Sequence, residues 1–224
     1  MAYSAPTLAE LRTIVARSLS DTSGVTFQPA ELTDFINEGI SELNRSHPIE
    51  DTLDLDASTS PPWLVDDVWT YIWRVELAFG GEVPTVVVPP DTLTQSRTGW
   101  SFYGGRVWLG DTWVSRVADL YEQYSSMSVF AFGYRNRQPL GGDTEVPEFI
   151  RQDDESGVRK YARVMGLRAL ASDRSLFQQW LAATNNTDLS INQLGGMLAQ
   201  AEGDWDKFIS RYYLIRRTPE GYDV

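Results

Sequence analysis

Helical periodicity is confined to the two ends of this 224-residue chain, and a stretch with the composition of β-strands separates them. Apolar residues recur every three or four positions between Thr7 and Leu43, and again after Pro147. A helical hairpin this short cannot bury its own apolar stripe, so each end needs the other as a packing partner. The pattern predicts an α+β fold in which N- and C-terminal helices form a helical bundle and a β-rich domain, sandwich-like or barrel-like, is inserted between them.

The changes of pattern divide the chain into four parts. We expect the N-terminal helical hairpin in residues 1–50, the β-rich insertion in 51–145, the long C-terminal helices in 146–217 and an extended tail in 218–224. A chain of this length can bury a sizeable core as one domain with an insertion. Such an arrangement suggests a structural module rather than a catalytic one.

The N-terminal part carries clear helix-boundary signals. Thr7 and Glu10 have the spacing of a capping box, and Pro29 suits the first turn of a second helix. His47 precedes Pro48, and a residue before proline disfavours the helical region, so the second helix should end there.

The middle part is rich in aromatic and β-branched residues, and six of the eight tryptophans lie between positions 63 and 113. Such residues favour strands. The expected strands cover 69–79, 84–89 and 128–135, together with a hairpin over 100–109 that turns at Gly104-Gly105. Residues 114–126 fit either a short helix or an extended strand.

The last part predicts a helix of about 25 to 30 residues after Pro147, a turn at Asn185-Asn-Thr-Asp and a final helix capped by Ser190 and Gln193. Apolar residues of the final helix alternate in steps of three and four: Ile191, Leu194, Leu198, Ala201, Trp205, Phe208, Tyr212 and Ile215. We expect this seam to pack against the preceding helix and the N-terminal hairpin. An interchain coiled coil would use the same pattern.

The formal net charge is −12 and is unevenly distributed. Residues 1–50 contain three basic and seven acidic side chains, residues 51–145 six and thirteen, and residues 146–224 ten and eleven. Such a surface would repel nucleic acid, although ordinary solubility is the simpler explanation of the acidity. No apolar run could span a bilayer and no signal sequence opens the chain, so we expect a protein made and used in a cytoplasm.

Residue usage argues against an enzyme. The chain has no cysteine and only one histidine, which excludes disulfides, thiol nucleophiles and multi-histidine metal clusters. Phosphate-loop, dinucleotide-binding and zinc-protease motifs are absent. His47 has no identifiable partner that would make it a general base, and a surface or helix-end histidine is the simpler interpretation.

Two acidic groups could in principle hold a hard cation: Asp51, Asp54 and Asp56, and the run Asp153–Glu155. Neither has the glycine and distal glutamate of a calcium loop, and the second lies where acidic residues favour a helix N-terminus. We therefore expect no catalytic residue, no metal site and no cofactor.

The C-terminal end concentrates residue types that are enriched at the centres of protein interfaces: Arg211, Tyr212, Tyr213, Arg216, Arg217 and Tyr222. Pro219 and Gly221 stop the helix, so this segment should contribute little to the core. We expect it to bind a partner. Favourable charge at a helix C-terminus is the alternative explanation of the arginines.

This order of parts resembles the head–tail adaptor (connector) proteins of tailed bacteriophages. The run Thr7-Leu-Ala-Glu-Leu-Arg and the helix from Pro29 to Leu43 are similar to the N-terminal helical hairpin of that family. Residues 160–180 look like its long helix after a β-domain. The resemblance implies a non-enzymatic virion protein that forms a ring, usually of twelve copies, under the portal and extends the DNA channel without reading the DNA sequence.

The resemblance also implies partners and a location. The C-terminal segment would bind the portal protein or else a neighbouring adaptor copy, and a tail-side neck or completion protein would join the ring from below. The ring would assemble in the host cytoplasm and lie in the virion neck, between capsid and tail. Two alternatives remain: another neck or tail-completion protein, and a carbohydrate-binding module built on the tryptophans, which more often serve as core and interface anchors.

Overall fold

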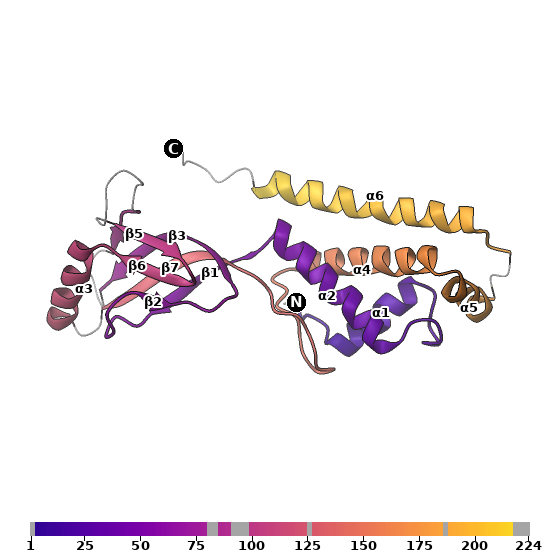
Figure 1. Cartoon of the computed structure of the whole chain (residues 1–224), viewed down its shortest axis with the longest axis horizontal. Coiled ribbons are helices and arrows are strands. Elements are labelled where there is room, and N and C mark those ends of the chain that lie inside the picture. Colours follow the sequence, from indigo (N-terminus) through magenta and orange to yellow (C-terminus); the bar gives the residue numbers. More distant parts are fainter. Residues whose placement is uncertain (1–2, 80–84, 91–98, 125–126, 186–187, 217–224) are drawn as a thin grey trace. The chain divides into compact units, whose positions relative to one another are not determined.

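The computed structural model describes residues 3–79, 85–90, 99–124, 127–185 and 188–216, except for the side chains of residues 212–216. The chain has an α+β fold and separates into two units (Figure 1). The helical unit consists of Met1–His47 and Arg137–Val224, and the β unit is the stretch between them, Pro48–Asn136.

The described part of the helical unit contains α1 (Leu8–Ser18), α2 (Pro29–Ser46), α4 (Gln152–Ser172), α5 (Arg174–Thr184) and α6 (Ile191–Arg216). The predicted capping box is present at α1, where Thr7 and Glu10 each accept the other's backbone N–H through their side chains. α2 begins at Pro29 and ends before His47, as predicted.

α4 contacts each of the other four helices and forms the centre of the helical unit. Glycines allow the close approach. A Cβ on Gly157 of α4 would lie 2.5 Å from the Phe208 ring of α6, and one on Gly39 of α2 would lie 2.9 Å from the Val158 carbonyl oxygen. The core draws side chains from both stretches of the chain, among them Leu11, Ile36, Leu167 and Leu194. Each end of the chain therefore covers apolar surface of the other.

The prediction of a single long helix after Pro147 is wrong, because the structure has two helices there, α4 and α5. Asp173 separates α4 from α5 and adopts an extended backbone conformation. Its carboxylate accepts the N–H groups of Ser175 and Leu176. An aspartate at this position satisfies amides that the start of a helix leaves free, so the break is locally stabilised.

α6 carries the predicted Ser190–Gln193 cap and packs its apolar seam against α4. Leu194 is fully buried, but Ile191, the first residue assigned to the seam, is 55% exposed. The ion pair between Arg168 and Glu202 aligns the two antiparallel helices. Ile191 precedes Glu202 by about three turns and therefore lies beyond Ser172, where α4 ends.

The described strands of the β unit form two antiparallel sheets. One has the order β1 (Ile49–Leu55), β7 (Ser128–Arg135), β3 (Trp69–Ala78), β4 (Val86–Val88); the other has the order β2 (Trp63–Leu64), β6 (Arg106–Leu109), β5 (Trp100–Tyr103). The predicted hairpin is confirmed: Gly104 and Gly105 link β5 to β6 with φ values of 59° and 67°.

The sheets share one apolar core. Val75, Leu77 and Val129 enter it from the four-stranded sheet, and Trp100 and Val107 from the three-stranded sheet. The ambiguous stretch 114–126 belongs largely to a helix, α3 (Asp111–Gln123), whose buried residue is Val117.

Gly133 of β7 has a demanding position in the four-stranded sheet. A Cβ there would lie 2.2 Å from the Tyr71 carbonyl oxygen, where the register of β3 against β7 shifts. Backbone cannot move aside as a flexible side chain can. We predict that Gly133→Ala lowers the free energy of unfolding by about 1–3 kcal/mol or more, because overpacked sites typically cost that much.

Thermal unfolding followed by tryptophan fluorescence checks this, because six of the eight tryptophans belong to the β unit. Gly141→Ala is the matched control, since a Cβ there meets nothing within 4 Å. Equal stability of the two variants would contradict the assigned packing at Gly133.

Candidate partner interface

The segment predicted to bind a partner lies at the C-terminal end of α6. Arg168 pairs with Glu202 at 2.8 Å, and the Tyr161 ring meets the Trp205 ring edge-on at 5.0 Å between centroids. Continued in this antiparallel register, the last turn of α6 lies beyond Gln152, where α4 begins. Figure 1 shows α6 (yellow) continuing past this end of α4.

Of the six residues assigned to this segment, Arg211 is described with its side chain, which is exposed. Arg216 follows Tyr212 and Tyr213 by about one helical turn, so the three positions lie on neighbouring parts of the α6 surface. The side chains of these three residues, together with Arg217, Tyr222 and the expected tail over 218–224, lie outside the described residues.

Arg137 and Asp154 form a buried polar cluster in the helical unit, which the sequence did not predict. Their ion pair measures 3.1 Å, and the two side chains are only 3% and 4% exposed. The Arg137 guanidinium also donates to the backbone oxygens of His47 and Glu148, at 2.5 and 3.2 Å. The backbone N–H of Arg137 donates to the side-chain oxygen of Asn44 at 2.9 Å. The cluster thus connects the residue where the chain leaves the helical unit, His47, with the residue where it returns.

The cluster also explains two candidates from the sequence. Asp154, from the acidic run Asp153–Glu155, is the partner of Arg137 and accepts the Ile150 N–H at 2.9 Å. His47 does lie at a helix end, but it is 3% exposed and hence not a surface residue. Its Nδ1 lies 2.9 Å from the Ser46 hydroxyl. Both residues are placed as parts of the folded core.

The other acidic group is not assembled into one site. Asp51 and Asp54 lie on opposite faces of β1, because alternate residues of a strand point to opposite sides. Asp51 accepts a hydrogen bond from Arg135 Nε at 2.6 Å, which holds the pKa of its carboxyl below the usual value. The side chain and N–H of Ser58 lower the pKa of Asp56 in the same way. Among the described residues, no three acidic or histidine side chains gather as metal ligands would.

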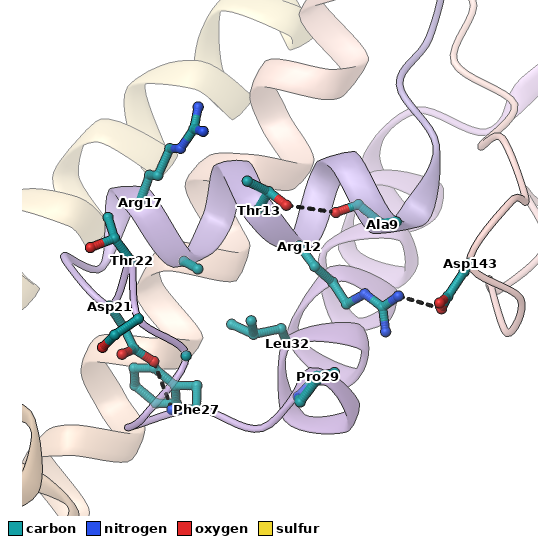
Figure 2. A pocket seen from close by; sticks show the side chains of 13 residues that line it. Ala9, Arg12, Thr13, Arg17, Asp21, Thr22, Phe27, Pro29, Leu32 and Asp143 are labelled. Atoms are coloured by element: carbon teal, nitrogen blue, oxygen red, sulfur yellow. Dashed lines mark hydrogen bonds and ion pairs between the residues drawn. The ribbon is translucent and has the colours of Figure 1, made fainter.

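A pocket of about 690 Å³ opens between α1, α2 and the loop that joins them (Figure 2). Three of its polar side chains have partners within the helical unit. Arg12 forms an ion pair with Asp143, and the Thr13 hydroxyl donates to the Ala9 carbonyl oxygen. Asp21, 1% exposed, accepts the N–H groups of Val25, Thr26 and Phe27. The bonds of Asp21 fix the loop between α1 and α2, so this residue has a structural role.

Five of the six tryptophans of the β unit divide into two groups, and the sixth, Trp113, is partly buried and packs against the core. Trp63, Trp69 and Trp100 are at most 8% exposed and belong to the core. Trp73 is 37% exposed, and Trp108 is partly exposed. The second group is therefore available for contact with another molecule.

Neither the models of known protein families nor the curated proteins include a match to this chain. No helix in the described part of the chain combines the length and apolar character needed to cross a membrane.

The buried ion pair between Arg137 and Asp154 predicts that replacing Arg137 strongly lowers the stability of the helical unit. Arg137→Met leaves the Asp154 charge buried without its partner, so we expect the helical unit to lose about 3–5 kcal/mol of stability. Arg168→Met is the matched control, since the Arg168–Glu202 pair is 49% and 40% exposed and such pairs contribute about 0–1 kcal/mol. Urea unfolding followed by far-ultraviolet circular dichroism separates the two, and equal losses would contradict the assigned role of Arg137.

Asp51 predicts a pH effect in the β unit. Its pKa is lowered in the folded state, so its stabilising contribution is present above the unfolded value of 3.8 and is lost as the pH falls through the folded value. Asp51→Asn should cost a few tenths to about 1 kcal/mol at pH 7, as for a partly exposed pair. The difference from the unmodified chain should shrink below pH 3.8. Denaturation of both proteins between pH 3 and 7 measures this difference in stability. Asp54→Asn, at an exposed position of the same strand, is the control.

Proposed function

We propose that this chain is a structural virion protein, a head-to-tail adaptor that forms a ring under the portal, extends the DNA channel and joins capsid to tail. The chain acts without catalysis. Its partners are the portal protein, a tail-side neck or completion protein and further copies of itself, in a ring of about twelve by family resemblance. It assembles in the host cytoplasm and resides in the virion neck.

The fold part of the proposal is a helical bundle interrupted by a β-rich domain. Support comes from the way both ends of the chain contribute helices to one unit, while a single continuous stretch, Pro48–Asn136, contributes the strands. α4 holds the two ends together by packing against α1 and α2 from one and α6 from the other.

The observation that carries the functional proposal is that α6 extends beyond the start of α4, the helix it packs against. Its seam packs against α4 as far as Phe208, and the last turn, Tyr213–Arg216, runs past the start of α4. Arg211 and Tyr212 lie just before this turn, and Arg211 is exposed; arginine and tyrosine are residue types that anchor interfaces. A helix that extends beyond its own core with such residues is better explained by a partner than by stability of the unit.

Charge supports a channel position. Nucleic acid carries a dense negative charge, so an acidic ring lets DNA pass without adhering. The chain carries 31 acidic against 19 basic side chains, and the excess lies before residue 146. The C-terminal part, nearly neutral, is the part assigned to the portal.

The half-exposed aromatic residues of the β unit keep a second class of function open. Tyr71 and Trp73 are 56% and 37% exposed, and exposed aromatic rings can stack on sugars. A carbohydrate-binding module would use them as a monomer and would not bind a portal. Another neck or tail-completion protein would share the ring but contact different neighbours.

The proposal predicts that removing residues 211–224 leaves a folded protein with a near-normal melting temperature that no longer binds portal rings. The full chain should sediment with portal rings purified from the same phage. Arg211→Glu should weaken this binding at least about tenfold, as reversal of an interface charge does. Arg174→Glu, an exposed arginine on α5, is the control and should change nothing.

Imaging of purified phage particles gives an independent check, with density for this chain expected between portal and tail. If the shortened chain still joins the portal, the C-terminal segment is not the docking site. Binding of glycans by a monomer with no affinity for portal would replace the adaptor proposal with the carbohydrate module.

A further inference from the structure

The outer face of the four-stranded sheet carries a strip of aromatic side chains that the core does not use. Tyr71 of β3 stacks against Tyr134 of β7, with ring centroids 6.4 Å apart and planes at 17°. The Trp73 ring also contacts the Phe132 ring, with centroids 5.9 Å apart and planes tilted at 43°, and the Arg74 guanidinium lies over the Phe132 ring. The apolar core lies on the opposite side of this sheet.

The border of this strip is negatively charged. Glu50 of β1 lies opposite Tyr134, and Asp54 lies opposite Phe130, so both carboxylates share the aromatic face. Both side chains are exposed. Arg74, the basic residue on this face, forms an ion pair with Glu76. We call this surface, formed by Tyr71, Trp73, Phe132, Tyr134, Glu50 and Asp54, the acidic aromatic face.

A second aromatic surface lies on the outer side of the three-stranded sheet. Tyr103 is 65% exposed and stacks on Trp108, with ring centroids 5.3 Å apart and planes at 13°. Leu64 is 73% exposed. Arg106 pairs in register with both Leu64 and Tyr103 and is exposed, so it lies among them. We call this surface, formed by Leu64, Tyr103, Arg106 and Trp108, the basic hairpin face.

Core residues from both sheets pack together between these two faces, which therefore lie on opposite sides of the β unit. Large aromatic side chains that are half-exposed and already ordered by stacking against a neighbour suit a protein interface, because little side-chain entropy remains to be lost on binding.

We propose that the acidic aromatic face of one copy binds the basic hairpin face of the next copy. Charge selects this pairing. Two acidic aromatic faces would bring Glu50 and Asp54 of each copy together, and two hairpin faces would oppose their Arg106 side chains. The mixed pairing joins opposite charges and covers both apolar surfaces.

A contact between two different faces of identical chains is head-to-tail, and it closes into a ring when the rotation between copies allows. The inference thus rests on the proposed function for the ring itself and adds the surfaces by which neighbouring copies meet. These surfaces belong to the β unit, whereas the segment assigned to the portal belongs to α6.

Charge reversal tests the contact with the full chain. Arg106→Glu places an acidic residue against Glu50 and Asp54, and the double variant Glu50→Lys/Asp54→Lys places basic residues against Arg106. Each variant alone should associate at least about tenfold more weakly than the unmodified chain. Mixed together, the two variants should regain association, because every contact in an alternating assembly again joins opposite charges.

Sedimentation velocity at concentrations up to about 100 μM and two salt concentrations measures this, since screening should weaken the contact. Asp119→Lys, an exposed position on α3, is the charge control. Unchanged association of Arg106→Glu, no recovery on mixing, or a monomeric chain throughout would overturn the proposal. A monomer that binds glycans and loses them with Trp73→Ser would identify the face as a carbohydrate site instead.

The outcomes separate this inference from the adaptor function. A chain that joins the portal but is indifferent to reversal at Arg106 loses the proposed contact and keeps the function. A chain whose variants recover on mixing but which never binds portal keeps the contact and loses the function.

Discussion

The helical unit depends on a buried charge pair at the place where the chain leaves it and returns. Arg137 and Asp154 are almost fully removed from water, which is tolerable only because the guanidinium and the carboxylate are hydrogen-bonded to further groups. Through His47 and Asn44 the pair holds the C-terminal end of α2 against the start of α4. The position of α4 then sets the course of α6, which packs along it and continues past it.

Local signals in the sequence predicted local structure. The capping boxes of α1 and α6, the proline at the start of α2 and the Gly-Gly hairpin each involve residues within a few positions of one another, and each is found as expected. The break at Asp173 was missed because apolar periodicity continues across it, although an aspartate followed by Arg174-Ser175 has the character of an N-cap.

Interactions across the fold could not be predicted in this way. Arg137 and Asp154 are separated in sequence by a loop, and neither has a pattern that identifies its partner. β1 was missed because its apolar residues alternate with acidic ones, which are uncommon in strands. The acidic aromatic face could not be predicted for a different reason. β3 shifts register twice against β7, so simple alternation along the strand does not tell which aromatic side chains face outward. Arg211 lies within the final helix, as helical periodicity predicts, and its assignment to a partner interface stays a prediction.

The division of the helical unit between two separated stretches sets an order on folding during synthesis. The β unit is continuous and can fold once Asn136 has left the ribosome, because all of its strands are then present. α1 and α2 are made before the β unit, yet their apolar surface has no cover until α4 appears more than a hundred residues later in the sequence. These two helices therefore become stable only after the β unit can fold, and their exposed apolar stripe is the surface on which a chaperone would act.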